Sequence, residues 1–229
     1  MGTKGILIDM GDTLIRNNNI DFSKSVNYLY NISSRCNCDK ETFIVESLRI
    51  LNDIFKERKI IEFKMIEYIE LLMCLYDLSF DKNIEEIEEE FAYKSCEINM
   101  VEDAEQILQY FKKKHYKIIL MSNTSFGRKI VLKMLGNLVD YFDDIIISSE
   151  TVFRKPSGYF FDIGIRKLLL NKKDIYYIGN DFYYDVYGSS EAGINSIWFN
   201  EKCVKKDTKL IVENFIEIQK YSQLIDKNF

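Results

Sequence analysis

Polar side chains follow four short apolar runs of this 229-residue chain, at or just beyond the points where the runs end. They are Asp9 after the first run, Ser122 and Asn123 after the second, Arg154 and Lys155 in the segment after the third, and Asn180, Asp181 and Asp185 after the fourth. If the runs are parallel strands, their carboxyl ends meet at one edge of a sheet, so these side chains can share a crevice.

This set of groups is suited to binding Mg²⁺ and a phosphoryl group together. Mg²⁺ prefers oxygen ligands, and it keeps several waters and a phosphate oxygen. The hydroxyl of Ser122, nearby backbone N–H groups and Lys155 can neutralise the charge of a phosphate. A carboxylate held in line with phosphorus can attack it and form an aspartyl phosphate, and Asp9 is the candidate for this role.

The segments between these residues predict a parallel sheet. After residue 100, helical patterns at 102–114, 126–138, 157–170 and 184–192 alternate with strand-like runs at 116–122, 144–149, 175–179 and 195–199. A short run at 210–212 and a last helix through Leu224 follow. Short apolar strands that alternate with helices indicate right-handed crossovers and a sheet covered on both faces. We therefore expect an α/β fold with a doubly wound parallel sheet.

Residues 20–98 have a helical period instead, and no strand of convincing length stands out. Phe43, Leu51 and Phe55, for example, fall on one apolar stripe. The acidic run at residues 85–90 is either a partner surface or, as we expect, the solvated side of an amphipathic helix.

The first strand belongs with the later α/β region, so the organisation is discontinuous. We expect a core domain of residues 1–16 and 100–229, and an all-helical cap of residues 17–99 inserted after the first strand. An insert at the carboxyl end of a sheet strand sits over the ligand crevice, which makes it a candidate lid.

Four motifs, in this order, resemble those of the haloacid dehalogenase (HAD) superfamily of aspartate-nucleophile hydrolases. They are Ile8-Asp9-Met10-Gly11-Asp12-Thr13, Leu120-Met121-Ser122-Asn123, Ser148-Ser149-Glu150 followed by Arg154-Lys155-Pro156, and Gly179-Asn180-Asp181 with Asp185 and Gly188. Each motif alone is weak, but all four in order around a helical insert are a specific combination. The resemblance covers about residues 1–20 and 100–220 and implies a Rossmann-like core. The insert is similar to the C1-type cap of subfamily I in position and helicity only.

The resemblance implies a role for each matching residue. Asp9 matches the nucleophile and a metal ligand, and Lys155 matches the lysine that pairs with it and with the phosphate. Ser122 matches the hydroxyl that hydrogen-bonds the phosphoryl group, with Asn123 beside it. The remaining matches are Gly11, whose backbone carbonyl would bind Mg²⁺, Thr13, which helps set the turn, Asp181 or Asn180 as the second metal ligand, and Asp185, which orients the site. We favour Asp181 over Asn180 on charge grounds.

The first motif departs from the family pattern. The usual acid/base stands two residues after the nucleophile, where this chain has Gly11. Positions i and i+2 of a strand share a face, whereas Asp12 stands at i+3. Asp12 either replaces the missing acid/base, if the turn redirects it, or caps the turn. General acid–base help contributes about 10²–10⁴-fold, so without it the enzyme would be slow or would favour good leaving groups.

Composition excludes several other classes. The chain has 31 basic and 36 acidic residues and a net charge of −5, which does not suit a general binder of nucleic acid or of anionic membranes. Its single histidine, His115, excludes histidine-rich zinc sites. It has no apolar run near ~18 residues, and from its first residues we expect no secretory signal. The five cysteines form no C-x-x-C pair, and we expect reduced thiols in a cytoplasmic protein.

We therefore expect a Mg²⁺-dependent phosphatase of a small phosphorylated metabolite. One alternative is C–halogen hydrolysis through an aspartyl ester, which needs neither Mg²⁺ nor a leaving-group acid. Another is a member without catalysis that binds a phosphoryl ligand or a protein. A receiver-type signalling domain also has a phosphorylatable aspartate, but it is too short and lacks the insert. The sequence leaves the metabolite and the oligomeric state open.

Overall fold

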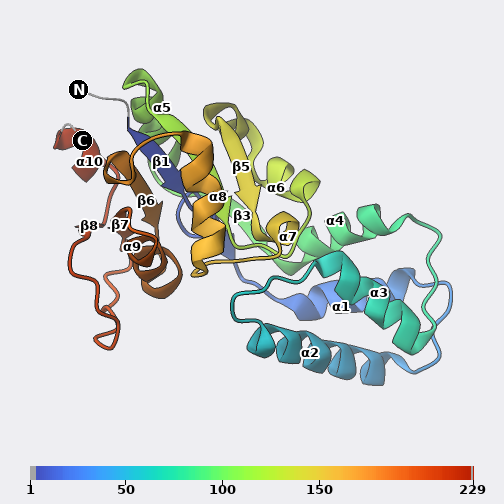
Figure 1. The fold of residues 1–229 in the computed structure, drawn as a ribbon. Coiled ribbons are helices and arrows are strands. Elements are labelled where there is room, and N and C mark those ends of the chain that lie inside the picture. Colours follow the sequence, from blue (N-terminus) through green and yellow to red (C-terminus); the bar gives the residue numbers. More distant parts are fainter. Residues whose placement is uncertain (1–3, 228) are drawn as a thin grey trace.

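Strand β1 (Gly5–Ile8) lies in the middle of a six-stranded parallel sheet of order β5-β4-β1-β6-β7-β8 (Figure 1). The computed structural model describes residues 4–227 and residue 229; residues 1–3 of the expected core domain lie outside the described residues. The other strands are β4 (Lys117–Ser122), β5 (Asp144–Ile147), β6 (Ile175–Gly179), β7 (Asn195–Phe199) and β8 (Ile216–Ile218). The expected doubly wound parallel sheet is thus confirmed.

Helices cover both faces of this sheet, and the side chains of β1 show why its sequence is apolar throughout. Ile6 and Ile8 pack in one apolar cluster with Ile107 and Phe111 of α5, whereas Leu7 faces the other side, in a cluster with α8. Alternate residues of a strand point to opposite faces, so a strand covered on both faces is apolar at every position. The helices here are α5 (Ala104–Lys113), α6 (Arg128–Leu135), α7 (Ser148–Thr151), α8 (Gly158–Leu168), α9 (Gly188–Glu191) and α10 (Ser222–Asp226).

Two local predictions in this region are corrected. The last strand is β8, which pairs with β7 in the register Ile197↔Ile216, and the run at 210–212 is not a strand. Leu210 and Val212 pack instead in a small cluster around Trp198. The predicted helix at 184–192 begins earlier, as a single π-helical stretch over Phe182–Tyr187 that leads into α9.

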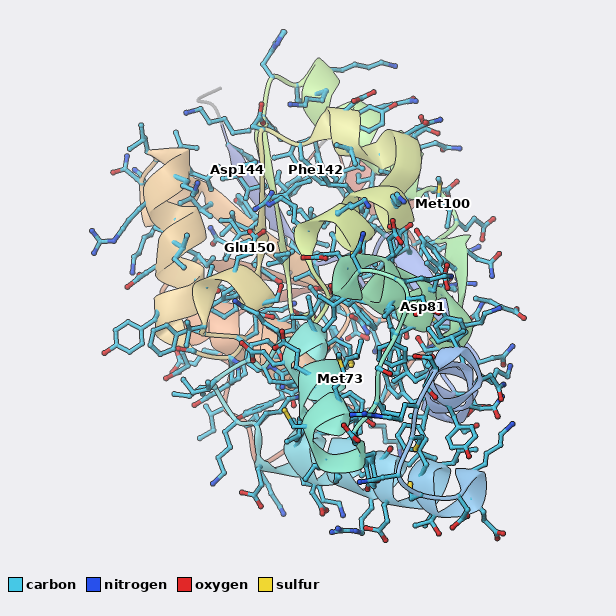
Figure 2. The ribbon with its side chains drawn as sticks, turned by 90° about the vertical axis from the view of Figure 1, so that its right-hand side faces the viewer. Met73, Asp81, Met100, Phe142, Asp144 and Glu150 are labelled. Carbon is cyan, nitrogen blue, oxygen red and sulfur yellow. The ribbon has the colours of Figure 1, made fainter. Side chains whose placement is uncertain are left out.

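Four helices form a second body with its own apolar cluster (Figure 1). They are α1 (Phe22–Ile32), α2 (Lys40–Glu57), α3 (Met65–Tyr76) and α4 (Ile84–Ser95), and we call residues 22–95 the helical segment. In Figure 2, Met73 of α3 lies with this segment, whereas Phe142 and Asp144 lie at the sheet end of the molecule. The side chain of Asp39 caps the N-terminus of α2, a position at which Asp is a preferred residue.

An antiparallel ribbon joins the helical segment to the sheet region. It consists of β2 (Ile15–Asn18) and β3 (Glu97–Met100), with Ile15 opposite Met100. The ribbon spans both expected domain limits, so the ends of the insert are extended and paired while its interior is helical. Within the described residues, no helix is both long and apolar enough to cross a membrane.

Candidate active site

Three charged side chains meet in the interior at the carboxyl edge of the sheet. Lys155 Nζ lies 2.6 Å from Asp9 Oδ1 and 2.6 Å from Asp185 Oδ1. The side chains of Asp9, Lys155 and Asp185 are 8%, 3% and 2% exposed, respectively. Three motifs that are far apart in the sequence thus form one buried cluster of two carboxylates and one ammonium group, as the convergence of parallel strand ends predicts.

Asp9 follows β1 directly, and its backbone N–H donates to the carbonyl of Ile178 in β6 at 2.9 Å. Lys155 is held through its backbone. The side chain of Asn123 accepts from Lys155 N at 2.8 Å and donates to Lys155 O at 3.1 Å. Asn123 therefore fixes the loop that carries the lysine, and it also lies beside Ser122 in the lining of the cavity described below.

Asp185 reaches the cluster from the π-helical stretch. Its Oδ2 accepts from the backbone N–H of Asp181 at 2.9 Å, which leaves Oδ1 for Lys155. The carboxylate packs against Gly179, where an added Cβ would lie 2.3 Å from Asp185 Cγ. A contact under 3.0 Å cannot be accommodated without movement, so glycine at 179 permits the position of Asp185.

Burial and neighbouring charges set the protonation of this cluster. Burial raises the pKa of Asp9 to about 6; Asp185 adds to the rise and Lys155 opposes it. Burial alone would lower the pKa of Lys155, but the charges of Asp185 and Asp9 outweigh it and raise that pKa above its ordinary value. The lysine therefore stays charged between the two carboxyl groups.

Oxygen atoms beside Asp9 fit a Mg²⁺ ion. The hydroxyl of Thr13 lies 3.4 Å from Asp9 Oδ2 and 3.3 Å from Asn180 Oδ1. The carboxylate oxygen of Asp9 and the amide oxygen of Asn180 therefore lie on either side of this hydroxyl. The carboxylate of Asp181 is engaged differently, since its Oδ1 accepts from the N–H groups of Tyr183 and Tyr184 and caps the π-helical stretch.

Among the described residues, no three carboxylate, histidine or thiol groups converge as a metal site. Mg²⁺ needs only one or two carboxylates besides waters and substrate oxygens, so the donor set around Asp9 fits this ion.

A cavity of about 400 Å³ opens over Asp9 between the sheet edge and the helical segment. Asp9, Gly11, Ser122 and Lys155 line it from the sheet side, and Phe22, Phe55 and Arg58 line it from the helical segment. Its size suits a small ligand, and both bodies contribute to its wall.

Asp12 does not join this cavity. Its backbone has a φ of 51°, and its carboxylate pairs with Lys202 at 3.0 Å. It lines a separate, smaller cavity with Asn200 and Glu201. Of the sequence-predicted site residues, Asp12 and Thr13 neither line this cavity nor belong to the buried cluster, although the hydroxyl of Thr13 lies beside the Asp9 carboxylate.

Contacts between the helical segment and the core were not apparent from the sequence. Glu88 is buried and accepts from the backbone N–H of Gly127 at 3.2 Å, and Glu89 pairs with Lys129 and Lys133 of α6. The expectation that the acidic run is a solvated helix side is therefore wrong for these two residues. Arg58 lines the cavity and Glu62 accepts a hydrogen bond from it, but neither residue belongs to a sequence motif. Arg154 also lines the cavity, and only its position next to Lys155 in the sequence points to it.

Comparison with known proteins decides the family. A model of the haloacid dehalogenase-like hydrolases matches residues 7–199, most of the chain. The chain belongs to this family. The structural match to an HAD phosphatase from Thermococcus onnurineus covers 99% of this chain and 98% of that protein, at 20% identity and a TM-score of 0.68. A 2-haloacid dehalogenase from Pseudomonas syringae covers 98%, with 97% covered in return, at 16% identity and a TM-score of 0.65. These likenesses establish the HAD fold.

Two curated relatives are named as phosphatases. The pyrimidine 5'-nucleotidase PynA of Streptococcus pneumoniae is 29% identical over 40% of the chain and 38% of its own length. The glyceraldehyde 3-phosphate phosphatase of Methanothermobacter thermautotrophicus is 24% identical over 47% of each. The matched regions span less than half of either relative.

Proposed function

We propose that this HAD-like hydrolase is a Mg²⁺-dependent phosphatase of a small phosphorylated metabolite, with Asp9 as its nucleophile. The observation that carries the proposal is the Asp9 carboxylate, which is paired with Lys155 at 2.6 Å and lines a cavity of about 400 Å³. Its relatives that act on phosphorylated substrates by name support the reaction class. We further propose that residues 17–99 act as a cap that limits access of water to the cavity.

The reaction has two steps. Asp9 attacks phosphorus, the bond from phosphorus to the leaving oxygen breaks, and the leaving alkoxide takes a proton from water, which becomes hydroxide. A second water then attacks the phosphorus of the aspartyl phosphate and loses a proton to this hydroxide, and the P–O bond to Asp9 breaks, which releases inorganic phosphate and restores Asp9. Lys155 and Ser122 neutralise charge on the transferring group. Asp185 and Asn123 act as positioning residues, since they hold the side chain and the backbone of Lys155.

For the metal we propose Asp9, the Gly11 carbonyl and Asn180 as ligands, with Thr13 orienting the first and the last. Asn180 replaces Asp181 as our preferred side chain, because Asn180 Oδ1 faces the same hydroxyl as Asp9 while Asp181 Oδ1 caps the π-helical stretch. Asp181 lines the same cavity, and we propose a water-mediated role for it. Bound Mg²⁺ would supply charge neutralisation to the phosphoryl group.

The position of Asp12 bears on the second candidate reaction. Since its carboxylate is paired with Lys202 and lies outside the cavity, Asp12 does not replace the acid that is missing at Gly11. C–halogen hydrolysis through an aspartyl ester needs no such acid, so the same observation favours it as the alternative.

The deciding experiment measures turnover of p-nitrophenyl phosphate and of 2-chloropropionate, each with Mg²⁺ and with EDTA. We expect phosphate release that EDTA abolishes, that Mg²⁺ restores and that falls at least about 10³-fold in Asp9→Asn. Dehalogenation that EDTA leaves unchanged, without phosphate release, would refute the phosphatase. No turnover of either compound would indicate the non-catalytic, ligand-binding alternative.

A further inference from the structure

Two arginines and one glutamate form a charged cluster in the wall of the Asp9 cavity. Arg58, from the segment after α2, and Arg154, from the loop before Lys155, both line the cavity. Glu62 lies behind them with its side chain fully buried. Arg58 Nη1 donates to Glu62 Oε1 at 2.9 Å, and Arg154 Nε lies 3.4 Å from Glu62 Oε2 without hydrogen-bond geometry.

The cluster has more positive charge and more donors than its own contacts use. Two guanidinium groups face one carboxylate, which leaves one net positive charge. Arg154 is 5% exposed, and its Nε has no hydrogen-bond partner. Among the described residues, the Arg58 side chain donates only to Glu62. Since Glu62 can neutralise only one of the two guanidinium groups, an anionic group of a ligand in the cavity would offset the remaining positive charge.

Neighbouring groups hold both guanidinium planes in place before any ligand binds. The Cζ of Arg58 lies 4.4 Å from the ring centre of Phe55 and 5.5 Å from that of Phe63. The Cζ of Arg154 lies 5.3 Å from the ring centre of Tyr184. Glu62 is fixed in turn by the hydroxyl of Ser148 at 2.8 Å. Arginine planes fixed on aromatic rings suit recognition of a carboxylate or a phosphate.

We propose that Arg58 and Arg154 form a second anion subsite, and that the preferred substrate is a phosphomonoester with another anionic group, a carboxylate or a second phosphate. This inference rests on the proposed phosphatase function, because it assumes that the phosphoryl group to be cleaved occupies the Asp9 end of the same cavity. The helical segment supplies Arg58 and the core supplies Arg154, so the second anion would also bridge the two bodies.

The test compares three phosphomonoesters of one chain length: 3-hydroxypropyl phosphate, 3-phosphooxypropanoate and propane-1,3-diyl bisphosphate. The first has a neutral end, the second a carboxylate and the third a phosphate. We expect at least one anionic compound to have a kcat/KM about 10- to 100-fold above that of the neutral one, the factor of a charge-assisted hydrogen bond. Which of the two is preferred identifies the second anion.

Arg58→Gln should remove this preference, because kcat/KM should fall much further for the preferred anionic compound than for 3-hydroxypropyl phosphate. Arg58→Lys, which keeps the charge but loses the planar fork, should restore it in part. Lys59→Gln is the matched control, because it removes an exposed charge from the neighbouring position and should change neither value.

Equal kcat/KM values for the three compounds in the wild-type protein would overturn the subsite, and this comparison needs no variant to fold. An equal loss in Arg58→Gln for all three compounds would also overturn it, since it would indicate a structural role. Failure of the phosphatase proposal is a separate result: none of the three compounds, nor p-nitrophenyl phosphate, would be hydrolysed by the wild-type protein.

Discussion

Replacement of Lys155 by methionine tests how strongly the buried cluster depends on its one positive charge. Methionine fills much of the same space but leaves Asp9 and Asp185 facing each other, with side chains 8% and 2% exposed. Removal of one partner from a buried ion pair lowers stability by about 3–5 kcal/mol. Small proteins have a free energy of unfolding of about 5–15 kcal/mol, so Lys155→Met should remove a large fraction of this free energy.

The loss should depend on pH in a defined direction. In the wild-type protein, the charge of Lys155 lowers the pKa of Asp9 and so opposes the effect of burial. Without Lys155, the pKa of Asp9 should move above its present value of about 6. A carboxyl group whose pKa is raised by folding stabilises the protein below its unfolded pKa of about 3.9, and this stability is lost as pH rises through the folded pKa. Lys155→Met should therefore be much closer to wild type at about pH 4 than at about pH 8.

Urea denaturation of both proteins in EDTA, at several pH values, measures this difference. The double variant Lys155→Met with Asp185→Asn serves as the control, because it also removes one of the two facing charges and should regain part of the lost stability. A loss below about 1 kcal/mol at about pH 8, or no recovery in the double variant, would show that the cluster is not held by its charges.

Further predictions concern four other positions. Gly179→Ala should lower kcat/KM for p-nitrophenyl phosphate at least about tenfold by displacing Asp185, whereas Gly158→Ala, where an added Cβ meets nothing within 4 Å, should leave it unchanged and stabilise the fold by up to about 1 kcal/mol. Asp12→Asn should keep kcat within about threefold of wild type, in contrast to a general acid. Burial raises the pKa of Glu88, so Glu88→Gln should raise the free energy of unfolding near neutral pH, and a pH series of melts should show this gain vanishing in acid.

The parts of the site that follow strands could be predicted from the sequence. Asp9, Lys155 and Asp185 come together because parallel strands end at one edge, a property of the fold that alternating strand and helix patterns already imply. The same alternation of strand and helix patterns also predicted the parallel sheet. The positions of Gly11 and Thr13 near Asp9 could also be predicted, because both residues follow Asp9 closely in the chain.

The parts that depend on contacts between distant segments could not be predicted. Nothing near Arg58 or Glu62 in the sequence indicates that they cluster with Arg154 in the wall of the cavity. The direction of Asp12 depends on one backbone angle, a φ of 51°, and on a lysine 190 residues away. Glu88 belongs to an acidic run typical of solvated helices, and only the packing of α4 near the start of α6 buries it.

The ribbon of β2 and β3 sets the two ends of the insert opposite each other, with Ile15 paired to Met100. A chain that leaves and re-enters the sheet region at one point can lengthen, shorten or exchange everything between without moving a single sheet strand. Ancestors of this chain could thus have acquired new ligand preferences by changes in the insert while Asp9 and Lys155 stayed in register. For the same reason, exchange of residues 19–96 for the corresponding segment of a relative is a practical route to a hybrid enzyme with altered selectivity.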